Sequence, residues 1–254
     1  MADEALSKTV VITGSGKGIG RALALKLASL SYNLVLNYIA DEASACDVLH
    51  CCQRLTPHVR LVRADVARRA EAELLIDTAY EAFGSVDILI NNAGVNIDKP
   101  LHELTDEDWD RVVDTNMKGV FLCAQRASSY MLQQPHGGVI LNIGASTAIR
   151  GRKNGLNYCA SKAGVLTMTK CLALELAPQV RVNCLIPGFT ATREVEHRYR
   201  LGDPEVLRGV KEKIPLHRIA APAEIAEVAA FLISDQARHM TGQKIIVDGG
   251  EFMF

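Results

Sequence analysis

The sequence contains no run of about 18 apolar residues, so no membrane-spanning helix is expected. Acidic and basic residues are nearly balanced, 29 against 28, and the formal net charge is −1. That balance gives no broad basic surface for nucleic acid or anionic membranes, and we expect neither as a partner. The first ten residues are acidic and lead quickly into a predicted strand, unlike a signal peptide. These absences favour a cytoplasmic protein.

Metal-binding and redox motifs are also missing. No two of the seven cysteines form a C-x-x-C pair, and the seven histidines include no H-E-x-x-H motif and no zinc-type cluster with cysteine. We expect no bound metal ion and reduced, buried thiols. The cysteines are Cys46, Cys51, Cys52, Cys123, Cys159, Cys171 and Cys184.

Short β-rich runs alternate with longer helical patterns along all 254 residues. Most runs are continuously apolar, as in strands that are covered on both faces. The alternation predicts an α/β fold, with a doubly wound and mainly parallel seven-stranded sheet and helices on both faces, in a single domain over residues 1–254. The predicted strands are 9–13, 33–38, 59–64, 86–91, 138–143, 180–185 and 244–247, and the predicted helices include 21–30, 70–82, 107–132 and 155–176.

Residues 193–221 depart from this alternation and are called the lid segment below. The segment is charged, contains Pro204 and Pro215, and is too long for a simple connection, so it is a candidate substrate-binding lid. Its interleaved basic and acidic residues fit either a dock for an acidic carrier or phosphorylated substrate, or a solvated amphipathic helix.

The turn after the first predicted strand is rich in glycine and reads GSGKGIG over residues 14–20. It matches neither G-x-G-x-x-G nor the phosphate-binding G-x-x-x-x-G-K-[ST] loop, but the spacing of Gly14, Gly18 and Gly20 remains. Glycines let a backbone turn sharply and approach a pyrophosphate at a helix N-terminus. A tight turn that binds nothing is the alternative interpretation.

Three further loops begin where predicted strands end. They start at Asp65, Asn91 and Pro187. Ligands of open α/β sheets bind outside the carboxyl ends of the strands. Any one loop is explained by turn chemistry alone, but four loops at one predicted edge indicate a shared binding site.

The ordered set of motifs resembles the short-chain dehydrogenase/reductase family. The set comprises T-G-x-x-x-G-x-G at 13–20, N-N-A-G at 91–94, Asn116, Y-x-x-x-K at 158–162 and P-G at 187–188. The set covers nearly the whole chain, and the sequence as a whole is similar to the 3-oxoacyl-carrier-protein reductases and glucose dehydrogenases. The resemblance implies a Rossmann-like domain, a nicotinamide cofactor, a carbonyl or alcohol substrate, and a homotetramer or homodimer.

The resemblance also implies which residues bind the cofactor. Asp65 is expected at the adenine, although an acidic residue there could equally cap a helix. The implied cofactor-binding residues are Gly14, Ser15, Lys17, Gly18, Ile19, Gly20, Asn37, Asp65, Val66, Asn92, Ala93, Gly94, Tyr158, Lys162, Pro187, Gly188 and Thr190.

Tyr158 and Lys162 are four residues apart, so they share one face of a helix. A free phenol has a pKa of about 10, and a nearby ammonium is expected to lower it. Tyr158 could then donate a proton to a carbonyl oxygen or take one from an alcohol. By resemblance, Lys162 also holds the nicotinamide ribose and Asn116 anchors a water that relays protons. A surface tyrosine and a structural asparagine are the alternatives.

One family residue is missing. The serine that binds the substrate oxygen usually lies three positions after the strand asparagine, here Asn142, and thirteen before the tyrosine, and both counts reach Ala145. Ser146 follows directly, with Thr147 after it. Three interpretations stay open: Ser146 reaches the site through a shifted loop, Ala145 is native to a slow or non-catalytic protein, or a serine has been replaced deliberately.

NADP is favoured over NAD as the cofactor. An acidic residue ending the second strand would bind the ribose 2′-hydroxyl and reject a 2′-phosphate, but that strand carries Asn37, and the nearest acids are Asp41 and Glu42. Lys17 could pair with a 2′-phosphate; a solvated loop lysine is the alternative.

Two functions follow from the sequence. The first is an NADP-dependent carbonyl reductase or alcohol dehydrogenase, and the second is a nucleotide-binding subunit that lost catalysis with the serine. Apolar residues on several faces of 107–132 and 155–176, and the apolar C-terminal residues 252–254, predict an oligomer.

Overall fold

The computed structural model describes residues 7–253 of the chain, so residues 1–6 and Phe254 lie outside it. Seven strands form one sheet in the order β3-β2-β1-β4-β5-β6-β7. Every neighbouring pair is parallel, which confirms the predicted sheet. The strands are β1 (Thr9–Ile12), β2 (Asn33–Tyr38), β3 (Val59–Arg63), β4 (Ile88–Asn91), β5 (Gly138–Ile143), β6 (Val180–Pro187) and β7 (Lys244–Val247).

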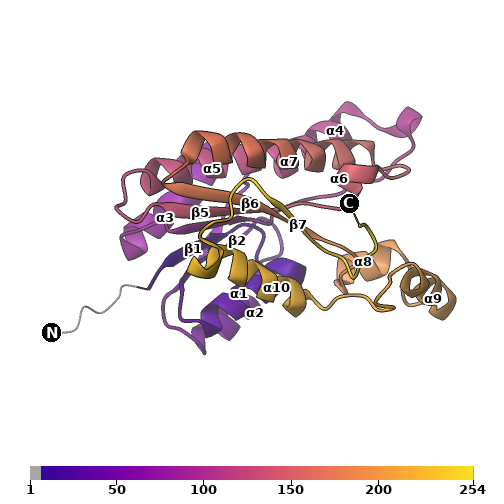
Figure 1. Cartoon of the computed structure of the whole chain (residues 1–254), viewed down its shortest axis with the longest axis horizontal. Coiled ribbons are helices and arrows are strands. Elements are labelled where there is room, and N and C mark those ends of the chain that lie inside the picture. The colour runs from indigo at the N-terminus through magenta and orange to yellow at the C-terminus, as the bar shows by residue number, and fades with distance from the viewer. Residues whose placement is uncertain (1–6, 254) are drawn as a thin grey trace.

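Helices cover both faces of the sheet (Figure 1). Alternate residues of β1 point to opposite sides, so Val10 and Ile12 join one hydrophobic core and Val11 joins the other. The first core is covered by α1 (Gly18–Ser29), α2 (Glu42–Gln53) and α10 (Pro222–Ile233), and the second by α3 (Arg69–Phe83), α5 (Gly119–Met131) and α7 (Leu156–Leu176).

The strand order reverses between β1 and β4, which places a crevice at their carboxyl ends. Thr13 ties the two strand ends together, because its Oγ1 accepts hydrogen bonds from the backbone amides of Asn92 and Ala93, both at 2.9 Å. The glycine-rich turn therefore lies directly beside the loop that follows β4.

The helix predicted over 107–132 is not continuous. It divides into α4 (Asp106–Val113), a π-helical turn η2 (Asp114–Lys118), and α5. Asn116 lies in the turn and is completely buried. π-helical turns are often found at functional sites, and periodicity alone does not reveal this one because its flanks are both helical.

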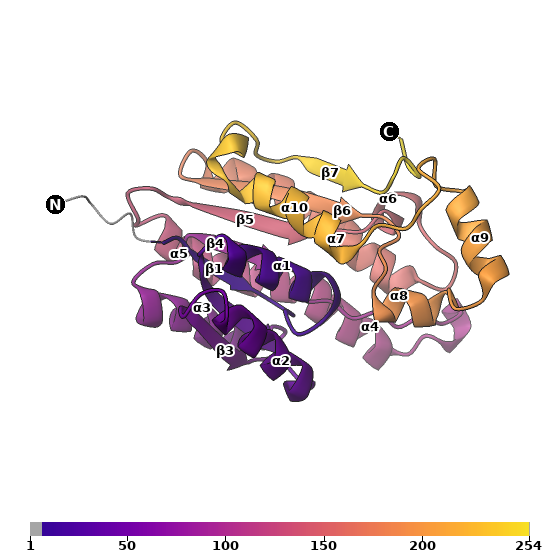
Figure 2. The ribbon, with the colours of Figure 1, turned by 90° about the horizontal axis from the view of Figure 1, so that it is seen from below.

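The lid segment is helical in two places, α8 (Arg193–Arg198) and α9 (Pro204–Glu212). Figure 2 shows both helices beyond the carboxyl ends of β6 and β7, close to the end of the molecule where α4 and α6 (Thr147–Arg150) lie. Two short 3₁₀ turns, η1 (Leu101–Glu103) and η3 (Asp235–Ala237), complete the described elements.

The prediction of buried thiols holds for three of the cysteines only. Cys52, Cys123 and Cys184 are buried, and burial raises the pKa of Cys123 to about 12. Cys171 is exposed because it lies on the outer face of α7, so the prediction is wrong there. No cluster of three or more His, Cys, Asp or Glu that could hold a metal occurs between residues 7 and 253, nor does any helix there suffice to span a membrane.

Candidate active site

A cavity of about 890 Å³ opens at the carboxyl edge of the sheet. It brings together the glycine-rich turn, the loops after β2, β3, β4, β5 and β6, and the start of the lid segment. Of the residues predicted to bind cofactor, those lining it are Gly14, Lys17, Gly18, Ile19, Gly20, Asn37, Asp65, Val66, Asn92, Ala93, Gly94, Tyr158, Lys162, Pro187, Gly188 and Thr190.

Ser15 is the exception among those predictions. It is 1% exposed and outside the cavity lining. Its hydroxyl donates to the backbone oxygen of Asn37 and accepts from the Asn37 amide, at 3.2 and 2.9 Å. Ser15 therefore joins the glycine-rich turn to β2, and its side chain is not placed to contact a ligand.

Several lining residues also build the site. The Asn37 side chain accepts from the Gly14 amide at 3.0 Å and donates to Ala64 O at 2.9 Å. The Asn92 amide donates to the backbone oxygens of Thr13 and Gly14. These polar side chains hold the loops in place, so they contribute to a ligand site mainly through shape.

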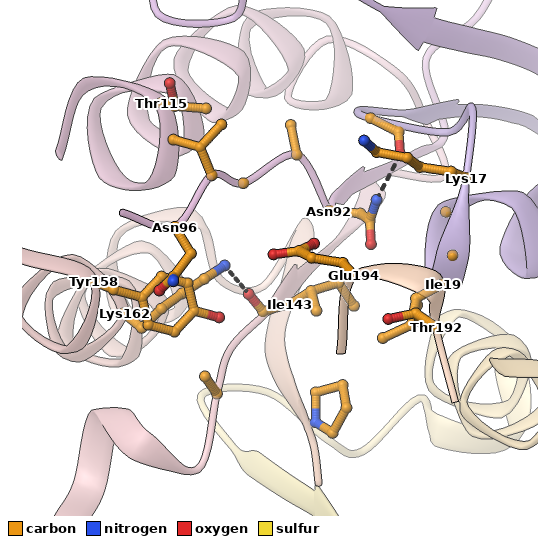
Figure 3. A pocket seen from close by; sticks show the side chains of 18 of the residues that line it. Lys17, Ile19, Asn92, Asn96, Thr115, Ile143, Tyr158, Lys162, Thr192 and Glu194 are labelled. Atoms are coloured by element: carbon orange, nitrogen blue, oxygen red, sulfur yellow. Dashed lines mark hydrogen bonds between the residues drawn. The ribbon is translucent and has the colours of Figure 1, made fainter. Parts of the chain in front are cut away.

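Tyr158 and Lys162 face the same part of the cavity from α7 (Figure 3). The Lys162 ammonium is buried and donates to Ile143 O at 2.7 Å, at the end of β5. The Tyr158 hydroxyl has no hydrogen-bond partner among residues 7–253. A phenol with a free hydroxyl beside a buried ammonium can exchange a proton with a bound molecule.

The pKa values of this pair differ from the sequence-based expectation. Burial raises the pKa of Tyr158 to about 12, and the charge of Glu194 adds to the rise, while Arg152 and Arg198 oppose it. The expected lowering is therefore wrong for the structure, since burial outweighs the neighbouring positive charges. Burial also lowers the pKa of Lys162 to about 8.

Asn116 lies behind the cavity wall and does not line it. Its side chain accepts from the Val95 amide at 2.7 Å and donates to Val95 O and to Ser161 Oγ, at 2.9 and 3.1 Å. A methyl group added to Gly94 would lie 3.3 Å from Asn116 Oδ1 and 3.7 Å from Lys162 Nζ. Asn116 therefore joins the loop after β4 to α7, close to the Lys162 ammonium.

Ala145 lies at the cavity, two residues after the end of β5, and no bulge in β5 shifts its position. The pairing of β5 with β6 runs without a bulge through Ile143, and the Gly144 amide donates to Leu185 O at 2.8 Å. Ala145 and Ser146 both line the cavity. Ser146 precedes α6, and its hydroxyl has no hydrogen-bond partner in the part of the chain that the structure describes. The Thr147 hydroxyl is buried and likewise unpartnered there.

A polar cluster near Tyr158 was not predicted from the sequence. Arg152 donates to Asn96 Oδ1 at 2.7 Å, to Asp98 Oδ1 at 2.5 Å and to the Tyr199 hydroxyl at 3.0 Å. Arg152 lies six residues before Tyr158 in the sequence, and that proximity was the only signal that could have found it.

The fold and the cavity together define a nucleotide-binding α/β protein of the Rossmann type, with a Tyr–Lys pair at its centre. Comparison with known proteins agrees with this class. Residues 14–251 match the family model described as enoyl-(acyl carrier protein) reductase, a short-chain dehydrogenase model. The chain belongs to the short-chain dehydrogenase/reductase family of oxidoreductases.

Individual relatives are similar over nearly their full lengths. A 3beta-hydroxysteroid dehydrogenase 1 of Eggerthella lenta is 38% identical, covering 100% of this chain and 97% of that protein. A 3-oxoacyl-[acyl-carrier-protein] reductase FabG of Staphylococcus epidermidis is 38% identical, covering 98% and 100%. The crystal structure of a short-chain dehydrogenase/reductase of the glucose/ribitol type from Brucella melitensis has a TM-score of 0.88 at 33% identity, covering 97% of both chains.

The glycine-rich turn fits the nicotinamide dinucleotide that this family uses. Gly14 and Gly18 have φ angles of +62° and +55°, which favour glycine. A methyl on Gly20 would collide with Gly14 O, and one on Gly14 would lie 2.8 Å from Ala93 Cα. The backbone therefore forms a cradle that side chains would fill, and α1 begins in it with its N-terminus available to phosphate.

We predict that Gly14→Ala destabilises the protein and weakens dinucleotide binding. Its positive φ and the close approach of Ala93 cost roughly 1–3 kcal/mol, which lowers Tm by about 2–12 °C for a chain of this size. Gly16→Ala is the matched control, because its methyl would meet Ala45 at an ordinary 3.6 Å. Thermal unfolding of both variants tests this, and equal Tm values would contradict the assigned strain.

Proposed function

We propose that the protein is an NADP-dependent oxidoreductase that interconverts a carbonyl and an alcohol, with Tyr158 as acid and base. The observation that carries the proposal is the placement of Tyr158 and Lys162 in the cavity formed by the glycine-rich turn. A nicotinamide bound there would supply or accept the hydride. The residues of this chain would supply binding, orientation and the proton.

Tyr158 would exchange its hydroxyl proton with the substrate oxygen. Its pKa of about 12 leaves the phenol protonated at neutral pH, which suits it to act as the acid in carbonyl reduction. Lys162 is held at Ile143 O, within the same wall, and its positive charge would stabilise the phenolate left after transfer. Asn116 would keep the loop after β4 against α7, which fixes the position of this pair.

Two features near the end of β2 support the choice of NADP: the carboxylate of the nearest acid is already hydrogen-bonded within its own turn, and a lysine lies at the cavity. That acid, Asp41, caps α2 by accepting from the Ser44 amide and hydroxyl, at 3.1 and 2.8 Å. These hydrogen bonds, with weaker contributions from Lys17 and Arg193, keep the pKa of Asp41 below its ordinary value. Lys17 is exposed at the cavity, where a 2′-phosphate could reach it.

We predict that NADPH binds more tightly than NADH and that Lys17→Ala removes most of the difference. A charge-assisted hydrogen bond to phosphate contributes roughly 1.5–3 kcal/mol, or at least about tenfold in affinity. Lys26→Ala is the control, because it removes the same charge from α1, the helix that follows Lys17, at a position outside the cavity lining. Titration calorimetry with both cofactors measures this, and equal affinities in the parent protein would exclude the NADP assignment.

The names of the relatives indicate the chemical class of the substrate. The relatives are named for 3-hydroxysteroid and 3-oxoacyl thioester substrates, so we propose a small molecule with a carbonyl or secondary alcohol. The experiment is to follow NADPH consumption against a panel of 3-oxoacyl thioesters, keto steroids and simple ketones. Absence of turnover across the panel with NADPH and NADH would reject the proposal.

A second function is favoured by one observation. Ala145 lines the cavity without a hydrogen-bond donor where the family has serine. A protein that binds dinucleotide tightly and turns nothing over would be a catalytically impaired nucleotide-binding subunit. Measuring cofactor affinity alongside turnover separates this function from the first.

We further propose a cytoplasmic homotetramer or homodimer, a single domain over residues 1–254, and a lid role for residues 193–221. Part of the apolar surface predicted for 107–132 and 155–176 is covered within the chain itself: Val112, Val120 and Val165 are buried, so the expectation is wrong for these residues. Phe121 on α5 and Leu174 on α7 stay exposed, at 42% and 83%, and support an apolar contact between subunits.

A further inference from the structure

Arg152 is partly buried and packs against the face of the Tyr158 ring. Its side chain is only 16% exposed, and its guanidinium carbon lies 5.4 Å from the ring centroid. A methyl group on Gly155 would lie 2.7 Å from Arg152 Nε, so the glycine that precedes α7 leaves room for the guanidinium there. A positive charge at this place attracts the electron-rich face of the ring.

Arg152 is fixed by partners from two other segments. In the loop after β4, Asn96 and Asp98 accept hydrogen bonds from its Nη2, and after α8 the Tyr199 hydroxyl accepts one from its Nη1. Asp98 is shared with Arg198 of α8, which also pairs with Glu194. The side chain is therefore locked in one position relative to Tyr158.

The charges of this cluster compensate one another. Two arginines, Arg152 and Arg198, stand against two carboxylates, Asp98 and Glu194. A cluster without net charge is a poor site for an anionic substrate group. Its geometry is directed instead toward the phenol, since the Arg152 guanidinium lies over the ring itself.

We propose that Arg152 is a positioning residue for Tyr158: it holds the ring and stabilises the phenolate form. The inference rests on the proposed function, in which Tyr158 exchanges the proton. Other charged or titratable groups that face Tyr158 are Glu194 and Arg198 of α8, Tyr199 after it, and Lys162 on α7 itself.

The test measures the ionisation of Tyr158 directly, without substrate. The protein is labelled with 3-fluorotyrosine, whose phenol is more acidic, and the Tyr158 resonance is assigned with Tyr158→Phe. Fluorine NMR titration then gives the pKa. Removing a positive charge near the ring disfavours the phenolate, so Arg152→Gln should raise that pKa by about 1 pH unit.

Two further variants make the test specific. Asp98→Asn removes the negative charge that compensates Arg152 and should shift the pKa in the opposite direction. Arg152→Lys keeps the charge and should lie between the parent and Arg152→Gln. Lys153→Gln, a neighbouring exposed lysine outside the cavity lining, is the control and should leave the pKa unchanged.

The outcomes are decisive. Opposite shifts in Arg152→Gln and Asp98→Asn support the proposal. Unchanged values, or shifts in the same direction, reject it, as they would mean that the cluster acts only on packing. If Arg152→Gln does not fold, Arg152→Lys and Asp98→Asn decide alone.

Turnover gives a second measurement. At fixed pH, a rise of 1 unit reduces the phenolate fraction about tenfold, so alcohol oxidation by Arg152→Gln should fall about tenfold in kcat with little change in cofactor affinity. If the parent protein turns nothing over, the proposed function fails while the titration still tests Arg152.

Discussion

Substitution of serine for Ala145 should raise kcat by about 10²- to 10³-fold on a ketone that the protein reduces. Ala145 lies thirteen residues before Tyr158 and lines the same cavity, after a strand that pairs with β6 without a bulge. A hydroxyl at this position would be a preorganised donor to the negative charge that grows on the substrate oxygen. Removing one such donor from an enzyme costs about 10²–10³ in kcat, so adding one should return a comparable factor.

Neighbouring hydroxyls provide the controls for Ala145→Ser. Ser146 and Thr147 both carry hydroxyls without a partner in the described chain. If position 145 is the missing site, Ser146→Ala and Thr147→Val should change kcat by less than about threefold. If one of these hydroxyls has taken over the role, its removal should abolish activity and Ala145→Ser should add almost nothing.

Steady-state rates for the parent and these variants distinguish the cases. Cofactor affinity should hardly change in any of these variants, because a hydroxyl that acts at this site would contact the substrate oxygen and not the dinucleotide. A protein that binds NADPH but stays inactive after Ala145→Ser, on a broad panel, would be better described as a nucleotide-binding subunit.

The fold could be predicted from the sequence because its signals are local. Most of the strands were marked by continuous apolar runs, and the second, fifth and seventh strands agreed with the prediction at both ends. Deviations came from contacts that local patterns do not record. The π-helical turn at 114–118 interrupts a stretch that is helical on both sides, since Asn116 turns inward to bond Val95 and Ser161.

The site was predictable only where motifs marked it. Residues at the ends of parallel strands meet at one edge, so the loops around Gly14, Ala93 and Gly188 could be placed together in advance. Arg152 and Asp98 carry no motif, and their contact joins two loops that are 54 positions apart. The raised pKa of Tyr158 was also inaccessible, because it depends on burial around the phenol.

Replacement of Tyr158 by phenylalanine should lower kcat by about 10²- to 10⁴-fold, which is the usual contribution of general acid–base catalysis. The change removes one oxygen and keeps the ring that packs under Arg152. Because the Tyr158 hydroxyl has no partner between residues 7 and 253, its removal should not disturb the fold. Affinity for NADPH should therefore stay within about twofold of the parent.

Lys162→Ala should lower both kcat and cofactor affinity, and this difference from Tyr158→Phe separates proton transfer from binding. Lys162 is buried in the cavity wall at Ile143 O, so its loss removes the ammonium from the phenol and from any ribose bound beside it.

The matched control for Tyr158→Phe is Tyr80→Phe, since it makes the same chemical change at an exposed tyrosine on α3. Stopped-flow rates and fluorescence titration with NADPH measure the two effects. A Tyr158→Phe variant that keeps most of its activity would show that the proton travels by another route, and Tyr158 would then be a wall of the cavity and not its acid.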